Sequence, residues 1–134
     1  MTNLHGGHSP AQLMSHFVKI LTKNGQRQDS VLARIHAQLK SRYGVDHPIH
    51  TAVESVKPVL KYQKFKNARH YVPIVLHPKS SEGIAIRWIV DAASNRKYQG
   101  RKSLERGLFD EFDGILQGNS PVYQKRLNFH RNPN

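Results

Sequence analysis

The 134-residue sequence contains no cysteine, which excludes disulfide bonds, thiolate metal sites and thiol nucleophiles. It has no apolar run near the roughly 20 residues that a membrane-spanning helix needs, so we expect no membrane partner. Its first stretch, MTNLHGGHSP, has neither the basic start nor the apolar run of a secretory signal. A glycine-rich phosphate loop, a nucleophile elbow and a convincing carboxylate pair are also missing. We therefore expect neither an enzyme nor a cofactor.

Acidic residues are scarce in this chain. It has 21 Lys and Arg but only 9 Asp and Glu, a formal net charge of +12 with histidine neutral. A chain this basic repels itself unless a polyanion lies beside it, so nucleic acid is the leading partner. An anionic membrane surface is the weaker alternative, because no strongly amphipathic basic helix with an aromatic-rich face is present.

The nine histidines include two pairs with ligand-like spacing, His5-x-x-His8 and His47-x-x-His50. Zinc usually needs a third or fourth ligand and a supporting shell of hydrogen bonds, and none is apparent in the neighbouring sequence. We therefore expect solvated or phosphate-facing histidines and no metal site.

The length and a hydrophobic content of 37% suit a mainly α-helical single domain over residues 1–134. Apolar residues recur at helical spacing in five or six segments. Residues 1–8 are expected to form a flexible N-terminus, and residues 119–134 a basic C-terminal segment. The expected helices begin at Ser9-Pro10, Asp29, Pro48, Ser81, Ser103 and Ser120-Pro121, and the first five end near Asn24, Gly44, Pro58, Arg96 and Gly118. The fourth contains Trp88, which we expect in the core.

Between the third and fourth helices the sequence pattern changes to β-branched and aromatic residues. The stretch from Val59 to Leu76, VLKYQKFKNARHYVPIVL, predicts two strands that turn at Lys66-Asn67. Pro73 restricts its strand to an edge, and both strands of a two-stranded ribbon are edges. Because a lone hairpin is barely stable in water, its base should rest on the helices or its tip on a partner.

This hairpin is predicted to be a basic arm, because no acidic residue lies between Glu54 and Glu82. Its cations alternate with aromatic residues, which suits RNA or DNA: cations meet phosphates, and aromatic faces stack on bases. The simpler interpretation is an exposed sheet edge that lysine keeps soluble. Two further basic stretches, the link from Arg96 to Lys102 and the terminal KRLNFHR, add to the same charge.

Five motifs resemble those of a known family. They are FVKILTKNGQR (17–27), AVESVKP (52–58), YVP (71–73), AIRWIVDAA (85–93) and KRLNFHR (125–131). In this order they resemble small-subunit ribosomal protein seven, of the bacterial and organellar type. The resemblance covers nearly the whole chain from Leu13 onward.

The resemblance implies a helical domain with a protruding hairpin that binds ribosomal RNA in the head of the small subunit and helps to assemble that head. The implied partners are this RNA, neighbouring small-subunit proteins, and exit-site transfer RNA and messenger RNA near the hairpin. Matching positions and the charge pattern together predict the RNA-binding residues. They are Lys23, Arg27, Lys61, Lys64, Lys66, Arg69, Lys79, Arg96, Lys97, Arg101, Lys102, Lys125, Arg126, His130 and Arg131.

The sequence also departs from the family's pattern. The paired glycines at the hairpin tip are Lys66-Asn67 here, and the arginine pair before the fourth helix is Ser80-Ser81. The usual basic N-terminal arm is replaced by a neutral start containing histidine, and the aromatic-rich C-terminal ending is missing. Such drift and trimming are more typical of organelles, so we expect a mitochondrial ribosome in the mitochondrial matrix.

Two other functions compete with the ribosomal interpretation. Helices with a basic ribbon arm also suit a free-standing architectural protein that bends DNA through its minor groove; it would be a dimer and would accept any duplex. An RNA-processing enzyme would need a carboxylate or histidine cluster in one pocket, and the sequence does not supply one.

Overall fold

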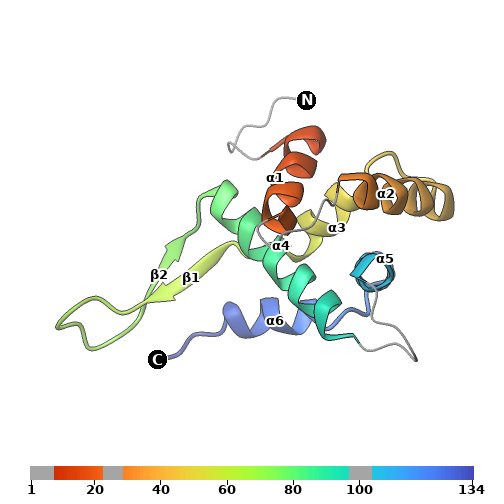
Figure 1. The fold of residues 1–134 in the computed structure, drawn as a ribbon. Helices are drawn as coiled ribbons and strands as arrows, with labels where there is room; N and C mark the ends of the chain where they lie inside the picture. Colours follow the sequence, from red (N-terminus) through yellow and green to blue (C-terminus); the bar gives the residue numbers. More distant parts are fainter. Residues whose placement is uncertain (1–7, 23–28, 97–103) are drawn as a thin grey trace.

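The structure is a computed structural model, which describes residues 8–22, 29–96 and 104–134. Within these residues the chain forms six helices and one antiparallel two-stranded sheet (Figure 1). The elements are α1 (Pro10–Thr22), α2 (Asp29–Tyr43), α3 (Pro48–Val56), β1 (Leu60–Gln63), β2 (Val72–Val75), α4 (Pro78–Asn95), α5 (Leu104–Gln117) and α6 (Val122–Phe129). The predicted mainly α-helical fold, with an arm between the third and fourth helices, is confirmed. Among the described segments, no helix combines the length and the apolar character needed to cross a membrane.

All six helices contribute to one hydrophobic core. Their apolar residues recur three or four positions apart, so each helix turns one face inward. Phe17 on α1 and Phe112 on α5 are fully buried, with ring centroids 5.6 Å apart. α4 runs through the middle of the helical body in Figure 1 and packs against α1, α3, α5 and α6. The buried core residues are Leu13, Phe17, Leu21, Leu32, Ile35, Leu39, Ile49, Ala52, Val53, Val56, Ala85, Ile86, Ile89, Val90, Ala93, Leu108, Phe112, Ile115 and Val122.

The close contact of α4 with α5 depends on a glycine. A Cβ placed on Gly107 would lie 2.5 Å from the backbone oxygen of Ala93. Glycine inside a helix is unfavourable by about 0.5–1 kcal/mol relative to alanine, so local helix propensity does not explain this residue. The close approach of the α4 and α5 backbones explains why glycine is there.

The start of α4 differs from the prediction, which had Ser81 as its cap. The helix begins earlier, at Pro78, and His77 caps it by accepting a hydrogen bond at Nδ1 from the backbone N–H of Lys79 (3.2 Å). Proline favours the first helical position because its φ is already helical and its missing N–H is not needed there. Ser81 therefore lies inside the helix, 3% exposed, and its hydroxyl donates to the carbonyl oxygen of Pro58.

The hairpin has the two strands and the turn that the sequence predicts, and the structure adds its register. Leu60 pairs with Val75 and Gln63 with Val72. The turn centres on Lys66-Asn67, where Asn67 has a φ of +70°. Asparagine is one of the few residues besides glycine that adopts this left-handed conformation readily. The chain therefore turns back without glycine at the tip.

The base of the arm rests on the helical body, as its short strands require. The backbone N–H of Val59 donates to Nε2 of His130 at 2.9 Å. Nε of Arg126 donates to the carbonyl oxygen of Lys57 at 3.1 Å. Together with the Ser81 contact from α4, these bonds fix the residues that lead into β1. The tip, in contrast, projects away from the helices (Figure 1).

Trp88 does not occupy the fully buried position that we expected. Its side chain is only partly buried at the edge of the core, and its ring meets Phe129 of α6 edge-on, with centroids 5.5 Å apart and an interplanar angle of 73°. The apolar face of α4 is wider than one core can cover, so Trp88 falls on its border and holds α6 there instead.

Candidate nucleic-acid interface

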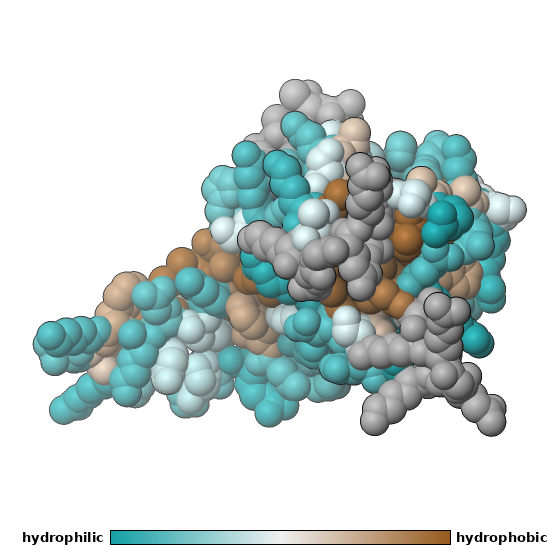
Figure 2. Space-filling view, viewed as in Figure 1, coloured by the Kyte–Doolittle hydropathy of each residue, from teal (hydrophilic) through white to brown (hydrophobic). Residues whose placement is uncertain are grey.

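The arm carries four of the predicted RNA-binding side chains away from the helical body. Lys61 lies on β1, and Lys64, Lys66 and Arg69 follow between the strands; all four are exposed. Residues 55–81 contain no Asp or Glu that could neutralise them. Figure 2 shows hydrophilic side chains gathered over the outer end of the arm, at the left of the view. The arm is therefore a concentrated positive surface.

Aromatic side chains accompany these cations. Phe65 is 50% exposed and Tyr71 39% exposed. Nζ of Lys64 lies 5.8 Å from the centroid of the Tyr71 ring, within the roughly 6 Å over which a cation and a ring attract each other. An exposed ring beside an ammonium group can stack on an unpaired base while the charge meets a phosphate. The arm thus offers both contacts that looped RNA uses.

A second positive surface lies where the arm joins the body. A groove of about 480 Å³ there is lined by Lys61 of β1 and by Lys79 and Arg87 of α4. The sequence prediction included Lys61 and Lys79 but missed Arg87, because Arg87 stands within an apolar stretch. Helical spacing could have revealed Arg87, because it lies eight positions after Lys79 and residues seven or eight apart lie near one face of a helix.

The C-terminal cations divide into two kinds. Lys125 and Arg131 are exposed, whereas Arg126 and His130 are half-buried and hold the base of the arm. Burial lowers the pKa of His130 below its usual value of 6.5, and the charge of Arg126 lowers it further. Nε2 of His130 accepts a hydrogen bond and must carry no proton to do so. His130 therefore supplies a structural bond in its neutral form.

Arg96 is also tied into the fold. Its Nε donates to Oε1 of Glu111 at 2.8 Å, and Glu111 is only 1% exposed. Oε2 of Glu111 accepts a further bond from the hydroxyl of Ser120 at 3.2 Å. A groove of about 350 Å³ nearby brings Arg96 together with Lys125 of α6. Arg96, which directly follows α4, and the C-terminal segment thus meet on one surface.

Five predicted RNA-binding residues lie outside the described residues. They are Lys23, Arg27, Lys97, Arg101 and Lys102. The expected helix cap Ser103, and His5 of the first histidine pair, lie outside them as well.

At the end of the body opposite the arm, two arginines of α2 pair with acids of α5. Nε of Arg34 on α2 donates to Oε1 of Glu105 on α5 at 3.2 Å. Nε of Arg42 lies 3.3 Å from Oδ1 of Asp113, which also accepts from the hydroxyl of Tyr43. In Figure 1, α2 and α5 lie at the right and the arm at the left. Part of the positive charge at this end is therefore neutralised, whereas the arm has no acidic residue to do the same.

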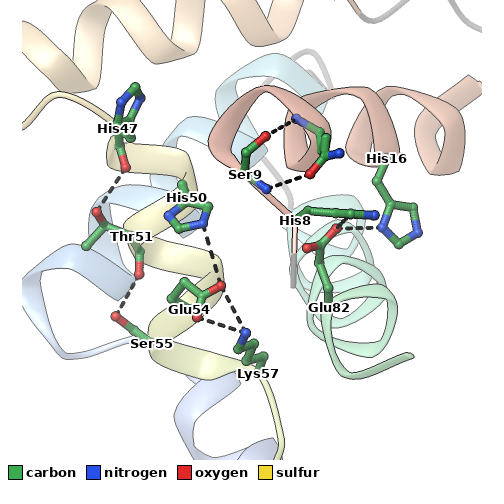
Figure 3. A network of polar contacts seen from close by, with 11 residues as sticks. His8, Ser9, His16, His47, His50, Thr51, Glu54, Ser55, Lys57 and Glu82 are labelled. Carbon is green, nitrogen blue, oxygen red and sulfur yellow. Dashed lines mark hydrogen bonds and ion pairs between the residues drawn. The ribbon is translucent and has the colours of Figure 1, made fainter. Parts of the chain in front are cut away.

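The described histidines include a group that their sequence spacing does not indicate. His8 meets His16 of α1 and the buried Glu82 of α4 (Figure 3). His50 lies 3.6 Å from Glu54 on its own helix. Local spacing does not reveal the first group, because Glu82 lies 66 residues after His16 in the sequence.

Comparison with known proteins adds to this geometry. The sequence profile of the family described as ribosomal protein S7p/S5e matches residues 5–133. The chain is similar to the small ribosomal subunit protein uS7 of Wigglesworthia glossinidia brevipalpis, with 28% identity over 127 residues. The aligned part covers 90% of this chain and 80% of that protein.

Proposed function

The chain belongs to the ribosomal protein S7p/S5e family, and from that premise we propose that it binds ribosomal RNA through its hairpin arm. Membership makes it a structural protein of the small ribosomal subunit and not an enzyme. The observation that carries the proposal is the uneven charge. Cations on the arm have no acidic neighbours in the sequence, whereas Arg34 and Arg42 of α2 pair with acids of α5.

The proposed RNA is the part of the small-subunit ribosomal RNA that forms the head, whose assembly the protein would help to start. Lys64, Lys66 and Arg69 would contact phosphates near the arm's tip, and Lys61 and Lys79 would do so in the groove at its base. The outer end of the arm would lie near exit-site transfer RNA and messenger RNA. The left-handed Asn67 supports a tight, narrow tip that can enter such a site.

Neighbouring small-subunit proteins are proposed partners too. Val75 on β2 is 78% exposed and Leu127 on α6 is 60% exposed. We propose these two side chains as contacts with such a partner. The proposal extends to a mitochondrial ribosome, supported by the replacement of the family's tip glycines and its arginine pair.

The test is a competition experiment with the full-length chain and an RNA that contains the head domain of the small subunit. Binding is titrated in salt, against equal masses of duplex DNA and of an unrelated structured RNA. We expect the head RNA to be preferred by about a hundredfold, which lies below the usual range for specific over non-specific sites because structured RNA is a close competitor. If every competitor displaced the head RNA equally well, the result would contradict the proposal and favour an architectural nucleic-acid-binding protein.

A further inference from the structure

Three side chains from separate elements converge beside the groove at the base of the arm (Figure 3). Nδ1 of His8 and Nδ1 of His16 each lie 2.7 Å from the same oxygen, Oε1 of Glu82. Glu82 has a side chain only 2% exposed, whereas those of His8 and His16 are 17% and 24% exposed. Among the described residues, they form the one group of three or more His, Cys, Asp or Glu able to hold a metal ion.

A buried carboxylate must have a compensating partner. Taking an ionised carboxylate out of water is so costly that such groups pair with a cation, bind a metal or become neutral. The two imidazoles are the partners that the structure gives to Glu82, and both approach one oxygen. Neutral imidazole is also the commonest metal ligand in proteins. Two imidazoles and a carboxylate form a set of three protein ligands found in zinc sites that keep a fourth position open.

The geometry needs only a small adjustment to accept zinc. Zinc bonds to nitrogen and oxygen of about 2.0–2.1 Å place tetrahedral ligand atoms about 3.3 Å apart. The nitrogen–oxygen separations of 2.7 Å would therefore open by about 0.6 Å. The rings of His8 and His16 are 85° apart, so their nitrogens approach from nearly perpendicular planes.

We propose that Nδ1 of His8, Nδ1 of His16 and a carboxylate oxygen of Glu82 bind a zinc ion. His8 and His16 also line the groove at the base of the arm, while Glu82 is buried. The fourth ligand therefore enters from the groove. Zinc there would clamp the segment before α1 onto α4, next to the surface that we propose for RNA.

The charges around the groove shape this site. Lys61, Lys79 and Arg87 line the same groove and repel a second cation. An anionic fourth ligand, such as chloride or a phosphate oxygen, would offset that repulsion. The ion does not depend on RNA, however, so its binding can be measured on the protein alone.

The experiment uses the full-length chain, freed of any histidine tag and dialysed against a chelator. Zn²⁺ is added at neutral pH in competition with a chromophoric chelator, and Co²⁺ replaces it to reveal tetrahedral coordination by visible absorption. We expect one ion per chain and a higher unfolding temperature when the ion is bound. His8→Ala and Glu82→Gln should each weaken zinc binding by about 100-fold or more, since even outer-shell partners contribute 10–100-fold.

His50→Ala is the matched control, because His50 also has a glutamate partner but lies outside the cluster. It should bind zinc like the unaltered chain. His8 lies outside the helices, so the His8→Ala variant decides the matter even if Glu82→Gln fails to fold. Zinc binding that is absent, or that is equally strong in His8→Ala, would overturn the site. The cluster would then be a hydrogen-bonded clamp alone. Neither result bears on RNA preference, which is measured separately.

Discussion

The helical body has two fully buried phenylalanine rings, whereas the arm exposes two of its aromatic rings. Phe17 and Phe112 have no exposed surface, while Phe65 and Tyr71 on the arm are 50% and 39% exposed. The two regions also treat charge differently, since residues 55–81 with the arm contain no Asp or Glu, whereas two arginines of α2 in the helical body pair with acids of α5. Stability and binding should therefore reside in different residues, and substitutions in one region should spare the other property.

The largest expected effect is on stability. Phe17→Ala removes a fully buried ring that packs on Phe112 and should cost about 3–5 kcal/mol in the free energy of unfolding. Phe65→Ala, which removes the same ring from the arm, should change that free energy by no more than about 0.5 kcal/mol. Urea unfolding of both variants checks the contrast. Similar losses in the two variants would mean that the arm is part of the folding unit.

A smaller loss is expected where two helices touch. Gly107→Ala forces a methyl group against the backbone oxygen of Ala93 and should destabilise the chain by about 1–3 kcal/mol. Gly83→Ala is the matched change within α4, because its Cβ would find Arg87 and His16 at ordinary contact distances of 3.5 and 3.6 Å. This second variant should be neutral or gain up to about 1 kcal/mol from helix propensity. A neutral Gly107→Ala in thermal unfolding would argue against the close contact.

The smallest effect is a dependence on pH at the joint between the regions. Because the folded-state pKa of His130 is lowered, the unfolded chain takes up the proton first. The contribution of His130 to the free energy of unfolding should be fully present above its usual pKa of 6.5. It should decline as pH falls from there through the lowered folded-state pKa.

The matching variant is His130→Gln. It keeps a hydrogen-bond acceptor for the backbone N–H of Val59 and removes the imidazole that titrates. Urea unfolding at several pH values should show a shallower decline than in the unaltered chain. His36, whose pKa burial lowers with help from His47 and Lys40, causes a decline of its own, so some slope should persist. Identical slopes in the two proteins would show that His130 does not stabilise the arm in its neutral form.

Local patterns in the sequence were enough to predict most of the fold. Helical spacing identified the six helices, and the polar pair Lys66-Asn67 located the turn of the arm. These features depend on residues a few positions apart, and so does the order of family motifs. The predicted cap of α4 was wrong. The sequence pattern favoured Ser81, whereas the helix begins at Pro78.

Features that depend on tertiary contacts were not predictable in the same way. The pairing of Arg96 with Glu111 and the contact of His130 with Val59 join parts of the chain that no local rule connects. Trp88 was placed in the core by helical spacing, yet its burial depends on how much of α4 the other helices cover. For the candidate site, charge counting found the exposed cations of the arm, while Arg87 and the cluster at Glu82 needed the fold.

The measurement that tests the account most directly joins both regions in one variant. Lys64, Lys66 and Arg69 are all changed to alanine, and the same protein is assayed for head-RNA binding in salt and for urea unfolding. The log-log salt slope should fall by about 0.7–0.9 for each phosphate that the variant no longer neutralises. The free energy of unfolding should stay within about 0.5 kcal/mol of the original.

The control changes Arg34, Lys40 and Arg42 of α2 to alanine, which removes the same charge from the end opposite the arm. Its salt slope should stay close to that of the unaltered chain. A lower slope for the arm variant alone, at unchanged stability, is the predicted result. An unchanged slope in the arm variant, or an equal fall in the control, would contradict RNA binding through the arm.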